Sequence, residues 1–256
     1  NVGDDTLVNI ENLIGTSYDD TLYGDEGNDT VTYSEANNGV TVNLATGIAV
    51  GEGTDTLFSI ENAIGSKYDD TFISNFTVSN KFDGGNDESG EINGDSISYQ
   101  TINVADTTKD KVVVNLSTGA DGQGYYDAQI YQNGSLSITD KLKNMENITG
   151  SAGNDTITGD NDKNTLYGLA GDDILEGGAG NDYLDGGTNT AVGDTVNYST
   201  STEGVTVDLG IDGVQQSIST SAGSDTLVGI ENVIGSSKAD TFKGNNAVSN
   251  IFNGGT

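Results

Sequence analysis

The sequence lacks several residue types that carry chemistry or rigidity: it has no cysteine, proline, histidine, tryptophan or arginine. Without cysteine there is neither a disulfide framework nor thiol chemistry. Without cysteine and histidine the chain has no ligand set for zinc or copper. The absence of proline leaves every backbone N–H available to a strand ladder. Rigidity must therefore come from another source, and an oxygen-bound metal ion is the obvious candidate.

Positive charge is also scarce. Nine lysines face 40 acidic residues, which gives a net charge of −31 over 256 residues. Such a charge repels nucleic acid and anionic membranes. No apolar run approaches the roughly 20 residues of a membrane-spanning helix, and residue 1 opens no signal peptide. We expect no nucleic-acid partner and no membrane insertion, and the charge opposes compaction unless a cation neutralises it.

The chain has 37 glycines, and in several segments they return at an interval of nine residues. From residue 150 the chain reads GSAGNDTIT, GDNDKNTLY, GLAGDDILE and GGAGNDYLD, and a stretched fifth copy leads to Asp194 and Val196. Position 6 of each copy is Asp or Asn, and position 8 is apolar. Looser copies at 15–32, 65–73 and 235–243 place further aspartates at position 6, namely Asp20, Asp29, Asp70 and Asp240.

A longer period is marked by IEN-type segments, in which Glu61, Glu146 and Glu231 are 85 residues apart. Strand-like stretches at 40–44, 112–116 and 205–209 precede them. We expect one continuous repeat array over 1–256, with sub-units of roughly 1–65, 66–150 and 151–235, a truncated 236–256, and an irregular excursion at 100–139. Because the chain ends within a motif, it is interpreted as a piece or a repeating unit of something longer.

The alternation of apolar residues between glycine and asparagine clusters predicts strands and turns rather than helices. Each nonapeptide supplies a six-residue turn and a three-residue strand, so two of them complete a coil. The predicted fold is all-β: a parallel β-roll or β-solenoid of stacked coils of about 18 residues with interspersed longer loops. If most of the chain coils, the array is a rod on the order of 50 to 65 Å long with a thin core.

Residues 18 apart lie one above the other on the same edge of such a stack, as Asp155 and Asp173 do, or Asn164 and Asp182. Stacked carboxylates at ~5 Å repel each other unless a hard cation lies between them. Glycine carbonyls in the turns can complete a shell of six to eight oxygens, which suits calcium better than magnesium. The spacing therefore predicts bound calcium along the array.

GGAGNDYLD fits the pattern GGxGxDxUx, where U is a large apolar residue, at every specified position. The chain thus resembles the RTX (repeats-in-toxin) calcium-binding β-roll proteins. This resemblance implies several bound Ca²⁺ ions, held by turn carbonyls and position-6 carboxylates. The candidate ligands that follow from it are Gly150, Gly153, Asp155, Gly168, Gly171, Asp173, Gly177, Gly180 and Asp182. The stretched and looser copies add Asp194, Asp20, Gly27, Asp29, Asp70 and Asp240.

Two further patterns have alternative interpretations. The glutamates of the IEN segments either form turns and ladders or supply a second ligand set, and the structural role is preferred. Threonine follows position 6 in nine Asp-Thr pairs. An outward threonine ladder is the preferred interpretation; an ice-binding face is the alternative, against which the turns lack a regular Gly-Thr-Gly-Asn series.

Catalysis is not expected, since no nucleophile lies beside a plausible base and the acids repeat evenly instead of converging. We expect a secreted, extracellular structural segment at the bacterial cell surface: an adhesin stalk, surface-layer subunit or filament that folds into a rigid rod on binding calcium. Its copies would join head to tail, covalently or by self-association. The alternative is a calcium-folding accessory module of a type-I-secreted enzyme or toxin.

Overall fold

The computed structural model describes residues 12–85 and 94–255, and over these ranges it contains β-strands and no helix. None of the described residues therefore forms a helix that could cross a membrane. The chain divides into two compact units. Unit 1 comprises Asn1–Ser98, Asp121–Tyr125 and Ile138–Met145; unit 2 comprises Tyr99–Ala120, Tyr126–Ser137 and Glu146–Thr256.

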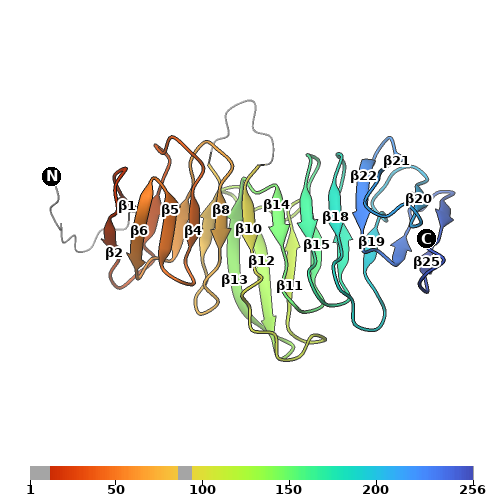
Figure 1. Cartoon of the computed structure of the whole chain (residues 1–256), viewed down its shortest axis with the longest axis horizontal. Coiled ribbons are helices and arrows are strands. Elements are labelled where there is room, and N and C mark those ends of the chain that lie inside the picture. Colours follow the sequence, from red (N-terminus) through yellow and green to blue (C-terminus); the bar gives the residue numbers. More distant parts are fainter. Residues whose placement is uncertain (1–11, 86–93, 256) are drawn as a thin grey trace. The chain divides into compact units, whose positions relative to one another are not determined.

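Unit 1 is built from two rows of short strands that lie side by side (Figure 1). One row has the order β1-β3-β7-β9-β13 and is parallel throughout. The other has the order β2-β6-β5-β4-β8-β10, in which β4, β5 and β6 pair antiparallel. The strands are β1 (Asn12–Ile14), β2 (Thr21–Tyr23), β3 (Thr30–Thr32), β4 (Thr41–Asn43), β5 (Ile48–Gly51), β6 (Gly53–Phe58), β7 (Asn62–Ile64), β8 (Thr71–Ile73), β9 (Lys81–Asp83), β10 (Ser96–Ser98) and most of β13 (Ser135–Lys143).

Unit 2 repeats this arrangement with longer hairpins (Figure 1). Its rows are β12-β11-β15-β17-β19-β23-β25 and β14-β16-β18-β22-β21, and β20 pairs with β24. The strands are β11 (Lys111–Asn115), β12 (Tyr126–Gln132), β14 (Asn147–Thr149), β15 (Thr156–Thr158), β16 (Thr165–Tyr167), β17 (Ile174–Glu176), β18 (Tyr183–Asp185), β19 (Thr195–Asn197), β20 (Thr206–Asp208), β21 (Gln215–Ser219), β22 (Gly223–Val228), β23 (Asn232–Ile234), β24 (Thr241–Lys243) and β25 (Ile251–Asn253).

The register confirms the coil of about 18 residues. Leu166 of β16 pairs with Leu184 of β18, and Ile157 of β15 pairs with Leu175 of β17, each 18 residues further on. These position-8 side chains are fully buried. Because each three-residue strand points only its middle residue inward, the core is one apolar layer per strand. The predicted all-β parallel roll is therefore confirmed.

Residues inserted between repeats do not change the pairing register of the strands that follow. The stretched fifth nonapeptide still places Val196 beside Leu175 in parallel pairing. The strand-like stretches at 40–44, 112–116 and 205–209 form β4, β11 and β20. The outward threonines do not form an unbroken ladder in unit 2, since Ile174 lies between Thr156 and Thr195. The sub-unit boundaries expected from the 85-residue period stay a prediction.

Candidate calcium-binding turns

Each position-6 aspartate lies in the turn that leads into a strand, and most of these side chains are buried. In unit 2, Asp155, Asp173, Asp182 and Asp194 are at most 2 % exposed, and in unit 1 Asp29 and Asp70 are 1 % exposed. Asp20 and Asp240 are half-buried. A fully buried carboxylate is costly unless it is protonated, hydrogen-bonded or paired with a cation. Each of these side chains therefore needs a partner.

A hydrogen-bond ladder connects successive coils of unit 2. The backbone N–H of Asp155 donates to Oδ1 of Asp173 at 2.7 Å, and the N–H of Asp173 donates to Oδ1 of Asp194 at 2.7 Å. On the opposite edge the N–H of Asn164 donates to Oδ1 of Asp182 at 2.9 Å. The stacking of residues 18 apart is thus as predicted. The repeat pattern did not predict that a backbone N–H donates to one oxygen of each of these carboxylates.

The second carboxylate oxygen is bare in four of the turns. Among the described residues, the buried oxygens without a hydrogen-bond partner include Oδ2 of Asp173, Asp182, Asp194 and Asp240. No lysine in the described ranges forms an ion pair with them. A buried carboxylate oxygen with no donor costs free energy that only a proton or a cation can recover.

The surroundings of the bare oxygen of Asp173 supply further oxygen. A Cβ placed on Gly168 would lie 2.7 Å from the carbonyl oxygen of Gly186 and closer still to Oδ2 of Asp173. Two acceptors from neighbouring coils thus face the Cα of Gly168, and the carboxylate oxygen has no hydrogen-bond donor. Only glycine leaves this space open. A carboxylate and a backbone carbonyl are ligands that calcium prefers.

Burial also perturbs the acid strength of these groups. Burial, with the nearby Asp155 and Asp194 carboxylates, raises the pKa of Asp173 to about 8. Burial likewise raises the pKa of Asp182 to about 7 and of Asp194 to about 7, in each case helped by neighbouring carboxylates. The pKa of Asp155 is raised by burial only to about 6, because hydrogen bonds from Ser151 and Val112 oppose it. Asp173, Asp182 and Asp194 thus hold their negative charge less well than Asp155 does.

The glycines predicted as calcium ligands differ in what surrounds them. Gly171 and Gly180 have φ values of +137° and +129° and approach the carbonyls of Gly153 and Asp162 in the preceding coil. Gly150 and Gly177 lie against the carboxylates of Asp155 and Asp182 in their own turns. A Cβ placed on Gly27 would meet no atom within 4 Å. Nowhere in residues 12–85 and 94–255 do three acidic side chains form a group that could hold a metal ion by themselves, so an ion would rest on few carboxylates and on several backbone carbonyls.

The sequence did not identify every member of the ladder. In unit 1 the N–H of Asp20 donates to Asp55, and in unit 2 the N–H of Asp182 donates to Asp225. The second oxygens of these two carboxylates accept hydrogen bonds from Tyr33 and Tyr198 respectively, each at 2.8 Å. Burial raises the pKa of both tyrosines, so they stay neutral donors. The signal was present as the Asp-Thr-Leu triplets at 55–57 and 225–227.

The IEN glutamates also belong to the ladder. Oε2 of Glu61 accepts the N–H of Asp29 at 3.0 Å, and Oε2 of Glu231 accepts the N–H of Asp194 at 2.9 Å. This is the structural role that the sequence favoured for these two residues.

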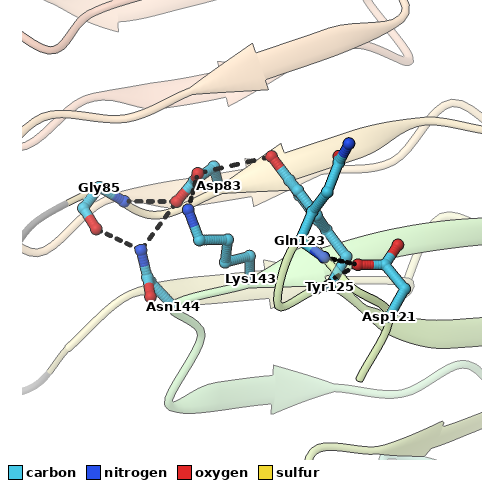
Figure 2. A network of polar contacts seen from close by, with 7 residues as sticks. All are labelled: Asp83, Gly85, Asp121, Gln123, Tyr125, Lys143 and Asn144. Carbon is cyan, nitrogen blue, oxygen red and sulfur yellow. Dashed lines mark hydrogen bonds and ion pairs between the residues drawn. The ribbon is translucent and has the colours of Figure 1, made fainter. Parts of the chain in front are cut away.

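Elsewhere in unit 1 an aspartate is neutralised by a lysine in a salt bridge (Figure 2). Asp83 pairs with Lys143 at 2.8 Å and accepts a hydrogen bond from Asn144 at 2.8 Å. Tyr125 approaches the same carboxylate, and Asp121 accepts the N–H of Tyr125, which anchors the loop at 121–125. The hydrogen bond to Asp83 raises the pKa of Lys143. With only nine lysines, the chain cannot neutralise most of its 40 acids in this way.

A comparison with known families agrees with this geometry. A family model of the RTX calcium-binding nonapeptide repeat, four copies long, matches residues 9–40, 145–169 and 158–190. The chain carries RTX repeats. Repeats of this family bind several calcium ions, and RTX proteins are typically secreted by the type I route. The matched segments contain Asp155, Asp173 and Asp182. No curated protein matches the chain significantly.

Proposed function

We propose that this calcium-binding repeat chain is an extracellular structural segment that becomes a rigid rod when calcium binds. It would serve as a stalk, surface-layer or filament building block at the bacterial cell surface. The observation that carries the proposal is the bare, buried Oδ2 of Asp173 beside the carbonyl of Gly186. This oxygen pair fits a divalent cation. The same bare oxygen recurs at Asp182 and Asp194.

Calcium would make folding of the chain depend on whether the chain is inside or outside the cell. Asp173, Asp182 and Asp194, with the turn carbonyls, would hold the ions, and the ions would supply the positive charge that the chain lacks. A site that exists only in the folded chain converts binding free energy into folding free energy. In a low-calcium cytosol the net charge of −31 keeps the chain expanded, and extracellular calcium folds it.

A second candidate is an accessory module that drives the folding of a type-I-secreted enzyme or toxin. The match to RTX repeats favours it as much as it favours a stalk. Both candidates are non-catalytic, as expected from a sequence in which no nucleophile lies beside a plausible base. Reading the gene on both sides of this segment separates the two, since an adjoining catalytic domain would support the module.

Circular dichroism during a calcium titration tests the proposal. Strand signal should rise cooperatively with calcium and fall again on chelation, and magnesium at equal concentration should produce less of it. A strand signal that is the same in chelator and in calcium would contradict calcium-coupled folding.

Joining of copies is the final part of the proposal. Phe252 of β25 is 41 % exposed, whereas Val233 and Val196, which precede it in the same strand row, are buried. Covalent continuation or stacking of a second copy would cover it. Sedimentation in calcium distinguishes these: concentration-dependent polymers indicate stacking, and a monomer at all concentrations excludes it.

A further inference from the structure

The residue at position 2 of each nonapeptide divides the turns into two classes. Turns in which its N–H donates to the position-6 side chain are called capped turns here: 15–20, 24–29, 65–70, 150–155 and 159–164. Turns in which Oδ2 at position 6 is bare and position 2 has a positive φ are called open turns: 168–173, 177–182 and 186–194.

Capped turns satisfy the carboxylate with protein donors alone. In the turn 150–155, Ser151 donates its N–H to Oδ2 of Asp155 at 2.5 Å and its hydroxyl to Oδ1 at 2.9 Å. The N–H of Val112 donates to Oδ1 at 2.6 Å. Ser66 and Asp70 form the same arrangement in unit 1, with N–H and hydroxyl donors at 2.5 and 3.1 Å. Serine often forms such local hydrogen bonds in turns, where its hydroxyl and its backbone N–H contact a nearby side chain or backbone group.

Open turns have lost this cap for a conformational reason. The position-2 residues Leu169, Gly178 and Gly187 have φ values of +81°, +98° and +91°. The backbone N–H of Gly187 interacts with Asp185 instead of Asp194. Position 2 of the capped turns is Thr, Asp or Ser, for which positive φ is unfavourable. Glycine adopts it freely, and Leu169 adopts it at a cost.

We infer that the residue at position 2 determines whether a turn requires calcium: the open turns take the ions, and the capped turns substitute backbone and hydroxyl donors for them. This inference rests on the proposed function. It assigns the calcium to Asp173, Asp182 and Asp194, and it gives Asp20, Asp29, Asp70 and Asp155 a metal-free structural role. The turn at 235–240 is intermediate, because the Ser236 hydroxyl reaches Oδ1 of Asp240 at 2.8 Å while Oδ2 is bare.

Matched asparagine variants test the assignment. Asp155→Asn and Asp173→Asn change the same atom in adjacent turns of one ladder. Asparagine is tolerated in a capped turn, since Asn164 accepts the N–H of Asp160 at 2.8 Å and donates to the carbonyl of Glu146 at 3.0 Å. Bound calcium is counted by native mass spectrometry and by calorimetry on the whole chain, and circular dichroism in calcium checks that each variant folds.

The expected result is that Asp155→Asn binds as many ions as the wild type and Asp173→Asn binds at least one fewer. Equal losses in both variants, or no loss in Asp173→Asn, would overturn the inference and leave calcium binding intact. A wild-type chain that binds no calcium would instead refute the proposed function. If Asp155→Asn does not fold, Asp70→Asn makes the same comparison in the other unit.

The converse variant is Ser151→Gly, which turns GSAGND into GGAGND. It removes the hydroxyl donor and frees φ, so the turn should open and the chain should gain one ion. The affinity of the existing sites should stay within about twofold. A folded Ser151→Gly chain with the wild-type ion count would contradict the role of position 2.

Discussion

The turns at 150–155 and 168–173 are adjacent in one ladder and yet are neutralised differently. Asp155 and Asp173 are both at most 1 % exposed, and each accepts an N–H from the preceding coil. In the first turn the second oxygen accepts the N–H of Ser151; in the second it is bare. Aspartate at position 6 is therefore not expected to be a calcium ligand in every turn. The residue four positions earlier decides what the carboxylate contacts.

The largest effect that would distinguish the two kinds of turn is expected in the pH dependence of folding without calcium. The pKa values of Asp173, Asp182 and Asp194 in the folded chain are about 8, 7 and 7. An unfolded carboxyl titrates near 3.9, so the folded chain binds more protons than the unfolded chain between about pH 4 and 8. This contribution to stability is complete below about pH 4 and is lost as the pH rises through 7 to 8.

In chelator, the strand signal and the thermal midpoint should therefore decrease as the pH is raised from about 5 to 8. Saturating calcium should flatten the dependence, because the ion replaces the proton. General charge repulsion has the same sign, so the control is the triple variant Asp173→Asn, Asp182→Asn, Asp194→Asn. A slope as steep in this variant as in the wild type would show that the open turns are not its source.

The next largest effect is expected from Asp173→Ala in saturating calcium. It removes a proposed metal ligand and leaves the N–H of Asp155 without its acceptor. Loss of calcium linkage at 100 times Kd costs about 2.7 kcal/mol, and a buried unpaired donor costs about 1–3 kcal/mol more. Urea unfolding in calcium should show a loss of about 4–6 kcal/mol.

Asp25→Ala is its control. The Asp25 side chain is exposed, and the backbone N–H of Asp25 that caps Asp29 survives the substitution. Its effect should stay within about 0.5 kcal/mol. Equal losses in Asp173→Ala and Asp25→Ala would show that position 6 has no special role.

The sequence predicted the coil well because its signals are local and periodic. Leu166 and Leu184 pair as their spacing of 18 requires, and Asp194 joins the ladder despite the insertion before it. The Asp-Thr-Leu triplet at 225–227 hinted that Asp225 is equivalent to a position-6 residue, but the nine-residue spacing did not show which aspartate it would meet. That contact depends on the pairing of β18 with β22, the second strand of the hairpin β21–β22, so Asp182 meets a residue 43 positions away.

The two classes of turn escaped prediction for a different reason. Serine at position 2 was visible in the sequence, but its effect depends on φ. Leu169 has a φ of +81°, a conformation that L side chains rarely adopt. Its conformation follows from the stacked coils around it, since Thr188 of the next coil donates its N–H to the carbonyl of Leu169 at 2.7 Å.

A pair of glycine variants sharpens the comparison by filling the cation space directly. In Gly168→Ala the new methyl group would enter the space between Oδ2 of Asp173 and the carbonyl of Gly186. Calcium affinity should fall at least tenfold, and stability in calcium should fall by about 1–3 kcal/mol. Gly27→Ala meets no atom within 4 Å. It should be neutral or stabilise by up to about 1 kcal/mol, and calorimetry showing similar calcium affinities for both variants would contradict the location of the site.

The smallest expected effect comes from Ser151→Ala, which removes only the hydroxyl part of the cap. Two hydrogen bonds are lost: from the hydroxyl to Asp155 at 2.9 Å and from the N–H of Gly153 at 3.1 Å. The loss should be about 1–2 kcal/mol in urea unfolding, because Ser151 is buried and its own N–H still caps Asp155. Ser199→Ala, at an exposed serine, is the control and should change little.

The calcium dependence of this loss is what distinguishes the capped turn. A variant that weakens a calcium site loses more stability as calcium rises, by about 1.4 kcal/mol for each tenfold increase up to the weakened Kd. In Ser151→Ala the loss should instead be constant from calcium equal to Kd to about 100 times Kd. A loss that grows over this range would mean that Asp155 binds calcium after all, and the capped and open turns would then differ in geometry without differing in their need for the ion.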